Sequence, residues 1–501
     1  MNTLTLWKLF HRRGARGIGE RTSALAVIAF AAATTIFLTV LGGVHGFIWR
    51  ASADHTLGCL IDSGSCAPGT YEAWKHALDE ANAFVADPGT RWTAERSAAV
   101  MDTYAGGYVI LAAFACLMLI VPFISLAGSA ARLAASRRDA RLSALRLAGA
   151  TTAQVVKLTA LDAAIQALFG AIIGIIGYVA VMPLIRLLKF QNRHFTFEQL
   201  WVGLPVLAGV LVGVTVLALV SSLITLRRVA ITPLGVMNRA AQPLPAAWRA
   251  LIFLVVMAGL YAMLSNASMF AGFAGLGENA VLVLVFGAFF VGFTMVNVVG
   301  TWVIAKRAKA RARRPKNAAV MIAARRILDN PKRAWRNVSG VGLAVFIAVI
   351  TSVGTSVSQA RGGDPLNPAT LYMRDIGTGG LLTLAFAAVL AAVSSGVMQA
   401  GSVYDQAAEY RMLRLEGTDE RTLARARFAE VFTPLNTVVL VSGCGSMLLL
   451  FPIIAMTLFE PVTLFSLLCG VALCYALIGV GALTANHAAR RLNMVEHRAD
   501  D

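Results

Sequence analysis

Long apolar blocks, separated by polar segments, run through the whole chain. A block of about 20 apolar residues is long enough to cross a lipid bilayer as one helix. The pattern predicts ten such helices, near residues 23–48, 107–131, 160–185, 201–226, 250–270, 280–304, 339–359, 379–403, 431–456 and 462–486. We therefore expect an all-α integral membrane protein with ten transmembrane helices.

The composition favours the same class of protein. Of the 501 residues, 57% are hydrophobic and 14% are charged, and the mean hydropathy is +0.70. A water-soluble protein of this length could not bury so much apolar surface, because much of its exterior must stay polar. The first apolar block is too long for a secretory signal peptide, and no small-residue cleavage pattern follows it. We expect this block to remain in the protein as the first span.

Basic residues are concentrated in alternate loops and at both ends of the chain. Residues 306–336 contain twelve Lys or Arg residues and one acid, Asp329. Basic residues also crowd the segments 8–21, 132–157, 227–249 and 490–498. Loops rich in Lys and Arg stay on the cytoplasmic side of a membrane, so both termini are expected in the cytoplasm. The net charge of +18 is therefore not taken as a sign of nucleic-acid binding, for which a basic folded soluble module would be needed.

The segment 50–105, between the first two predicted spans, has the opposite charge balance. It contains eight acids and four basic residues, so we expect a small extracytoplasmic element. Cys59 and Cys66 lie in this segment, and a pair of cysteines on an exported loop favours a disulfide. A metal site is the alternative, but His55 is not accompanied by a cluster of further ligands.

A nearly identical pentapeptide occurs twice, as LRLAG at Leu145–Gly149 and as LRLEG at Leu413–Gly417, 268 residues apart. The similarity continues beyond both copies, and each copy lies between two predicted spans. Upstream, residues 20–30 resemble residues 335–346, but at an offset of 316, so the first copy has 48 additional residues between its first two spans. The sequence thus predicts two parallel four-helix repeats and a two-helix linker in a 4+2+4 arrangement. Their expected limits are 1–240, 241–317 and 318–501.

Both pentapeptides have the pattern of a helix that ends at a glycine and is followed by a second helix. Arg and Leu alternate along residues 137–157, which suits a helix with a charged face and an apolar face. Gly149 and Gly417 would end these helices, and Thr418 precedes acids in the first turn of the next helix. A solvated basic loop would explain the arginines alone. The repeated leucines on one face favour a surface that docks another protein.

The repeated segment resembles the cytoplasmic signature of FtsX-like (MacB-type) permeases of ABC transporters. The matching residues of this sequence are Leu145, Arg146, Gly149 and Asp162 in the first copy, and Glu409, Leu413, Arg414, Gly417 and Glu430 in the second. Arg141 stands where the family often has an acid. Residues 227–239, with Pro233, resemble the end of the family's fourth span. Residues 324–337 resemble its amphipathic helix on the membrane surface, which would suit an anionic leaflet.

The resemblance implies a non-catalytic permease subunit in the plasma membrane of a bacterium, worked by a separate cytoplasmic ABC ATPase. This chain has no G-x-x-x-x-G-K-[ST] motif with which to bind nucleotide phosphates, so ATP and Mg would bind to the partner, and no cofactor is expected on this chain. Two docking helices would match two ATPase subunits. Arg141 and Arg146 would lie at that contact with Leu145 and Gly149, as would the matching residues Glu409, Leu413, Arg414 and Gly417.

Three functions stay open at this point. The first is ATP-driven export or membrane extraction of an amphiphile such as a peptide, an antibiotic or a lipid. The second is signalling, in which the segment 50–105 would bind an extracytoplasmic partner and control a cell-wall hydrolase. An ion-coupled carrier is disfavoured because the centres of the predicted spans lack charged residues. Asp162 and Glu430 lie near span ends, where they would anchor the helices or couple them to the ATPase.

Overall fold

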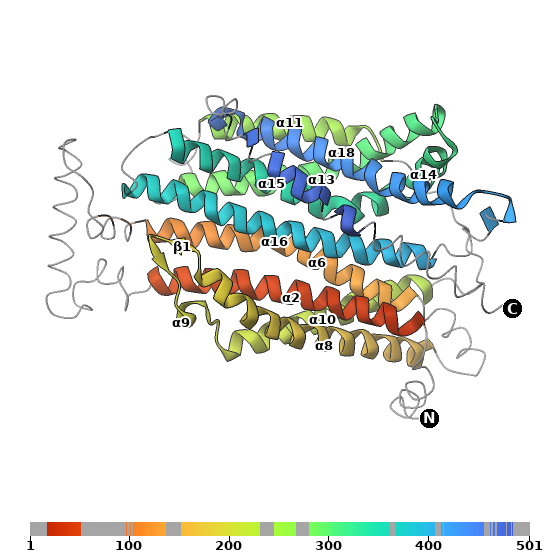
Figure 1. Ribbon diagram of the computed structural model, residues 1–501, viewed down its shortest axis with the longest axis horizontal. Helices are drawn as coiled ribbons and strands as arrows, with labels where there is room; N and C mark the ends of the chain where they lie inside the picture. The colour runs from red at the N-terminus through yellow and green to blue at the C-terminus, as the bar shows by residue number, and fades with distance from the viewer. Residues whose placement is uncertain are drawn as a thin grey trace.

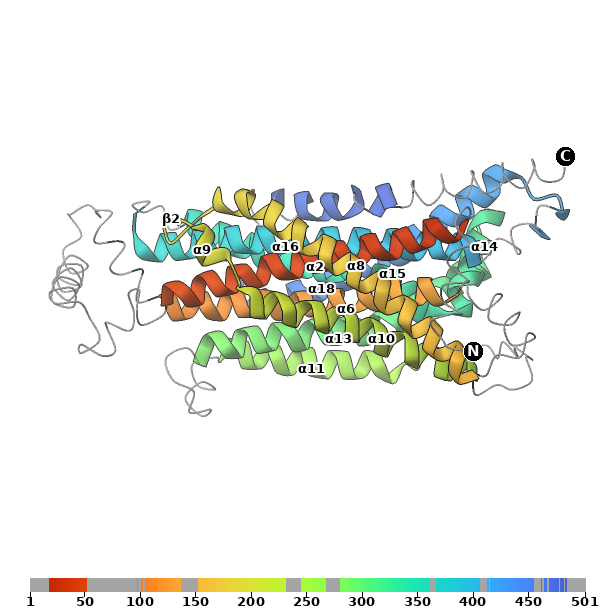
Figure 2. The ribbon, with the colours of Figure 1, turned by 90° about the horizontal axis from the view of Figure 1, so that it is seen from below.

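The computed structural model describes the chain in segments. These are residues 18–51, 104–136, 152–230, 245–266, 280–360, 366–405 and 412–454 without Arg414, together with residues 97 and 101 and part of 461–483. Long helices that run side by side make up nearly all of this structure (Figures 1 and 2). Cys59 and Cys66 lie outside the described residues, so their disulfide stays a prediction.

The first half of the chain contains four long helices. They are α2 (Ile18–Ala51), α6 (Ala105–Ser136), α8 (Thr152–Arg186) and α10 (Leu204–Ala230). A short antiparallel hairpin of β1 (Lys189–Phe190) and β2 (Arg193–His194) and the one-turn helix α9 (Phe197–Leu200) connect α8 to α10. The turn residues Gln191 and Asn192 both have positive φ values, 56° and 58°, as the two-residue turn of a tight hairpin requires.

Among the described residues of the second half, six more helices have bounds that the structure defines. They are α11 (Trp248–Ser265), α13 (Ala280–Arg313), α14 (Ala318–Asp329), α15 (Pro331–Ala360), α16 (Pro368–Asp405) and α18 (Glu420–Ile454). The residues that resembled a single surface helix, 324–337, are divided between α14 and α15. Asn330 separates the two, and its side chain accepts a hydrogen bond from the Arg333 backbone N–H at 3.0 Å. Pro331 is suited to the first position of a helix, because it has no backbone N–H to leave unpaired there.

Within the described residues, eight helices are long and apolar enough to cross a membrane. They are Ser23–Ala51, Ala105–Gly128, Ala160–Arg186, Phe197–Leu223, Trp248–Ser265, Val283–Arg313, Pro368–Gln399 and Glu420–Phe451. These helices overlap eight of the ten predicted blocks, which confirms an all-α, multi-pass membrane protein. The seventh block lies within α15 and the tenth overlaps a shorter apolar helix, Leu468–Gly481. The number of ten spans therefore stays a prediction.

The helices of the two halves pack in the same pattern. In the first half α2 packs along α6 and α8, and in the second half α15 packs along α16 and α18. The halves meet where α16 packs against α6 and α2 (Figure 1). This is the pairing that two copies of one unit would produce, with α2 equivalent to α15 and α6 to α16. It supports the predicted repeats, whose limits the structure does not test.

Glycines of α8 allow it to approach α2 closely. A Cβ atom at Gly170 would lie 2.5 Å from the Cβ of Phe30, and one at Gly174 would lie 2.5 Å from the Cβ of Thr34. Close backbone contact of this kind stabilises helix pairs in membranes, where lipid competes for apolar side chains. The glycines of α8 thus serve its close packing against α2.

The bundle has two ends of different construction. The hairpin end comprises β1, β2, α9 and the adjoining ends of α2, α6 and α16. The α14 end comprises α14 and the adjoining ends of α13, α15 and α18. Figure 2 shows the hairpin and α14 at opposite ends of the long helices. The expected cytoplasmic segments 306–336 and 413–417 adjoin the α14 end, and the expected outer segment 360–378 adjoins the hairpin end.

Candidate functional site

The structure describes only part of the predicted docking surface. Leu413 is half-buried in a short helical stretch before α18, and Gly417 is exposed. The remaining predicted docking residues lie outside the described residues; they are Arg141, Leu145, Arg146, Gly149, Glu409 and Arg414. The first copy of the segment thus stays a prediction, and the geometry below concerns the second copy.

A tight turn at Gly417 ends the helical stretch. Gly417 has a φ of +86°, a conformation that glycine adopts without steric penalty. The Thr418 backbone N–H donates to the Leu413 carbonyl at 3.0 Å, which is the long bond of a Schellman-type helix ending. The turn that the sequence predicts at this glycine is therefore present.

Two apolar side chains next to this turn are strongly exposed. Leu415 is 77% exposed, the highest value among the large apolar side chains that the structure describes, and Met412 is 64% exposed. Sequence reasoning chose Leu413 as the residue that fills a groove on the partner, whereas Leu413 is half-buried in this chain. The same pentapeptide contains a second leucine, Leu415, two residues further along. This repeated leucine could have been chosen from the sequence as the residue that contacts the partner.

The two predicted acids lie in corresponding places on α8 and α18. Both Asp162 and Glu430 are half-buried, near the ends of these helices that follow the docking segments. A Glu430 oxygen lies 3.5 Å from an Arg326 nitrogen of α14. Glu430 therefore connects α18 to α14, the first helix of the second predicted repeat, as an anchoring or coupling acid would.

Arginine and tryptophan side chains make further polar contacts at the α14 end. Arg307 and Arg311 of α13 donate hydrogen bonds to Thr437 and Thr433 of α18, the first at 3.4 Å. The Trp335 indole N–H of α15 donates to Asn297 of α13 at 3.0 Å. Each of these contacts joins one pair of helices through one or two bonds.

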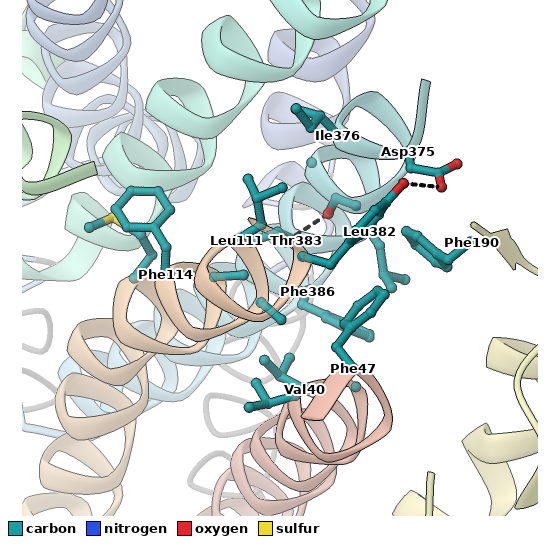
Figure 3. A pocket seen from close by; sticks show the side chains of 18 of the residues that line it. Val40, Phe47, Leu111, Phe114, Phe190, Asp375, Ile376, Leu382, Thr383 and Phe386 are labelled. Carbon is teal, nitrogen blue, oxygen red and sulfur yellow. Dashed lines mark hydrogen bonds between the residues drawn. The ribbon is translucent and has the colours of Figure 1, made fainter. Parts of the chain in front are cut away.

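An apolar cavity of about 160 Å³ lies where the two halves meet, near the hairpin end (Figure 3). Residues of α2, α6, α15 and α16 line most of it, and Phe190 and Phe195 of the hairpin segment also contribute. Phe47 of α2 lies beside both phenylalanines, with ring centroids 5.6 Å and 5.3 Å away. The volume of this cavity is similar to that of a cavity that admits one benzene molecule.

The polar side chains in the wall of this cavity use their protons within the protein. Thr39, Thr351 and Thr383 each donate to a carbonyl oxygen four residues earlier in their own helix, at 2.7, 2.9 and 2.7 Å. Tyr108 donates to Asp375 at 2.8 Å. A polar group placed in the middle of the cavity would lose its hydrogen bonds to water without full replacement, so the interior favours hydrocarbon.

Asp375 of α16 joins the two halves of the chain at one edge of the cavity. Its side chain is fully buried. One of its oxygens, Oδ2, accepts from the Tyr108 hydroxyl of α6 and, at 2.6 Å, from the Gln191 backbone N–H in the hairpin turn. Both donors belong to the first half, so this carboxylate ties the second half to the hairpin.

Arg50, at the end of α2, binds the hairpin segment from its other side. Its guanidinium donates to the carbonyl oxygens of Phe190 and His194, both at 3.0 Å, and to the side-chain oxygens of Gln191 and Gln199. It also lies over the ring of Phe195, 4.1 Å from the centroid. Sequence reasoning identified neither Arg50 nor Asp375, because their partners lie more than 130 residues away along the chain.

Within the described residues, no group of three or more His, Cys, Asp and Glu side chains could bind a metal ion. The candidate sites are therefore the exposed turn at residues 412–417 and the cavity near the hairpin end. The first offers an apolar surface to another protein. The second offers an apolar interior beside a hydrogen-bonded, charged edge.

The comparison with protein families identifies one segment of the chain. Residues 110–234 match the family described as FtsX-like permease C-terminal. The match extends from α6 to the end of α10 and includes the segment 137–157 and Asp162. It confirms the resemblance found in the sequence: the chain carries an FtsX-like permease domain, of the kind found in non-catalytic ABC permease subunits that work with a cytoplasmic ATPase. No curated protein and no solved structure matches the chain.

Proposed function

We propose that this chain is the permease subunit of an FtsX/MacB-like ABC transporter and exports or extracts an amphiphile from the membrane. It acts in a bacterial plasma membrane, with ten spans and both termini in the cytoplasm. The α14 end then faces the cytoplasm and the hairpin end faces outward. A separate ATPase binds ATP and Mg and drives the transport.

The observation that carries this proposal is the exposed apolar turn at the α14 end. Large exposed apolar groups near a charged surface are typical of protein interaction sites. Leu415 and Met412 project from a turn whose backbone is fixed by Gly417. The matching pentapeptide at Leu145–Gly149 supplies a second site of the same kind, so one chain binds two ATPase subunits.

The cavity supports transport over signalling. It lies between the two halves, which the ATPase would move relative to each other. Its apolar interior suits the hydrocarbon part of an amphiphile. In the signalling alternative, the acidic segment 50–105 would instead bind an extracytoplasmic partner, and that segment lies outside the described residues.

ATPase binding by docking variants tests the proposal. We expect Leu145→Asp, Leu413→Asp and Leu415→Asp each to weaken the complex by about 2–3 kcal/mol, because each places a charge in an apolar contact. The double variant Leu145→Asp/Leu415→Asp should lose the ATPase. The measurement is the amount of ATPase that co-purifies with the tagged chain, and its affinity for the purified chain.

Leu204→Asp is the matched control, because Leu204 is 73% exposed at the other end of the bundle. It should retain the ATPase. Leu204→Asp and Leu415→Asp should both keep the wild-type unfolding temperature, because both side chains are strongly exposed. Full retention of the ATPase by the double variant would show that the repeated segments do not dock it. Retention combined with a partner captured by residues 50–105 would favour the signalling function.

A further inference from the structure

Exposed basic residues surround the hairpin, on the side of the bundle where they are not expected. Lys189 and Arg193 lie on the two strands, and Arg374 lies at the nearby end of α16; all three are exposed. In the proposed orientation these residues face outward. Lys and Arg are normally enriched in cytoplasmic loops, so topology does not account for them.

These charges have little compensation within the described part of the chain. Neither Lys189 nor Arg193 has a carboxylate partner there. Arg374 is 47% exposed, and its nitrogen lies 3.8 Å from Asp375, a carboxylate that already accepts two hydrogen bonds. Among the described residues near the hairpin, Glu198 of α9 is an exposed acid. The described surface at this edge therefore has an excess of positive charge.

The basic residues adjoin the wall of the cavity directly. Lys189 precedes Phe190, and Arg193 is the cross-strand partner of Phe190 in the hairpin. Arg374 precedes Asp375. Both Phe190 and Asp375 line the cavity, on opposite sides of the contact between the hairpin and α16 (Figure 3). The basic residues Lys189 and Arg374 are thus immediate neighbours in the chain of residues that line the cavity.

We propose that the cavity and this rim form a binding site for an anionic amphiphile. One apolar chain enters the cavity between α2, α6 and α16 with the part next to its head. Its acidic headgroup, a phosphate or carboxylate, pairs with Lys189, Arg193 and Arg374. The assignment rests on the proposed function, since it names the class of amphiphile that the permease handles. A cationic head would meet like charges at the rim, and an uncharged head would leave them without a partner.

Photo-crosslinking of the full chain without ATPase tests the site independently of docking. The chain is placed in phosphatidylcholine nanodiscs and exposed to dodecyl phosphate that carries a diazirine in its alkyl chain. Dodecanol and dodecylamine with the same diazirine are the matched probes. We expect dodecyl phosphate to label peptides of α2, α6 and the hairpin about tenfold more than either, as charge-assisted hydrogen bonds to its head predict.

Two pairs of variants separate the rim from the cavity. Lys189→Gln/Arg193→Gln should reduce labelling by dodecyl phosphate about tenfold, whereas Lys309→Gln/Lys332→Gln, exposed at the α14 end, should leave it unchanged. Gly43→Phe should abolish labelling, because Gly43 lines the cavity and a Cβ there meets no atom within 4 Å. Gly213→Phe is its control on the exposed face of α10, where a Cβ also meets no atom within 4 Å.

Equal labelling by the three probes, or undiminished labelling of Gly43→Phe, would overturn the proposal. Labelling that appears only after the acids of 54–87 are neutralised would also overturn the proposal. The basic residues of the rim would then pair with those acids and not with the headgroup of an amphiphile. Competition by phosphatidylglycerol in the disc identifies a bilayer lipid as the source of the ligand. Competition by added lysophosphatidic acid alone identifies an amphiphile that arrives from outside the bilayer.

Discussion

The two ends of the bundle use charged side chains in different ways. At the hairpin end, Arg50 and Asp375 bind several groups each, and their partners include backbone atoms of the hairpin segment. At the α14 end, Arg307 and Arg311 each donate to one threonine of α18, and Glu430 lies beside Arg326 of α14. A cluster of large apolar residues is buried around the hairpin, with Leu187 and Leu204 exposed at its edge, and Leu415 is exposed at the α14 end.

The two ends therefore differ in how far contacts within the chain hold them together. The hairpin end satisfies the polar groups of its turn within the chain and covers one edge of the cavity. The α14 end exposes the apolar side chains of its turn, Met412 and Leu415, which the proposed partner would bury. The comparison therefore predicts that substitutions at the hairpin end change the stability of the chain, while substitutions at the α14 end mainly change the binding of its partner.

The largest effect on stability is expected at Asp375. Replacing Asp375 by Ala leaves the Tyr108 hydroxyl and the Gln191 backbone N–H buried without their acceptor, and should lower the free energy of unfolding by roughly 3 kcal/mol. Asp375→Asn retains an acceptor oxygen and should lose less than half as much. Unfolding of the purified chain in detergent micelles measures both, and equal stability of Asp375→Ala and wild type would contradict this role.

A matched pair of arginines tests the comparison directly. Arg50→Met removes every guanidinium bond to the hairpin segment and should lower stability by about 2 kcal/mol. Arg307→Met removes one bond to Thr437 and should lower it by roughly 0.5 kcal/mol. The same unfolding measurement applies, with Arg50→Lys as the control that keeps the charge but not the planar set of donors. An equal loss at both ends would contradict the proposed difference between them.

The smallest effect is a gain at the hairpin turn. Asn192 has a φ of 58°, which glycine adopts more easily, so Asn192→Gly should raise stability by about 0.5 kcal/mol. Asn192→Val should lower it, because a β-branched residue is strongly disfavoured at positive φ. Hydrogen exchange of the hairpin amides would show both changes. Unchanged protection in both variants would mean that the turn does not limit the stability of this end.

Local patterns were sufficient to predict much of the fold. Apolar blocks located eight helices that are long enough to span a membrane, and Gly417 identified a turn, because each of these features depends on neighbouring residues. The early start of α16 could also have been found: Asn367 accepts from the Ala369 backbone N–H, and Pro368 occupies the first helical position. Hydropathy alone begins the apolar block near residue 379, and this leaves Arg374 and Asp375 in a loop, although α16 begins at Pro368.

The cavity and its charged edge could not be predicted in this way. Tyr108 and Asp375 are 267 residues apart in the sequence, and nothing in either local pattern identifies the other as its partner. The hairpin turn has the residues Gln191 and Asn192 rather than a strong Asn-Gly signal. A cavity depends on which side chains fail to fill a space, so it follows from packing between helices of both halves rather than from any one segment.

The long separation of Asp375 from its partners has a consequence for biosynthesis. A ribosome that has translated Gln191 must add 184 more residues before Asp375 exists. At about 5–20 residues per second, this interval lasts roughly 10–40 seconds. Throughout it, the inserted first half has no carboxylate for Tyr108 or for the hairpin turn. During this interval, membrane chaperones and quality-control proteases would encounter the first half without its hydrogen bonds to Asp375. Truncated chains that end before residue 375 would never form these bonds.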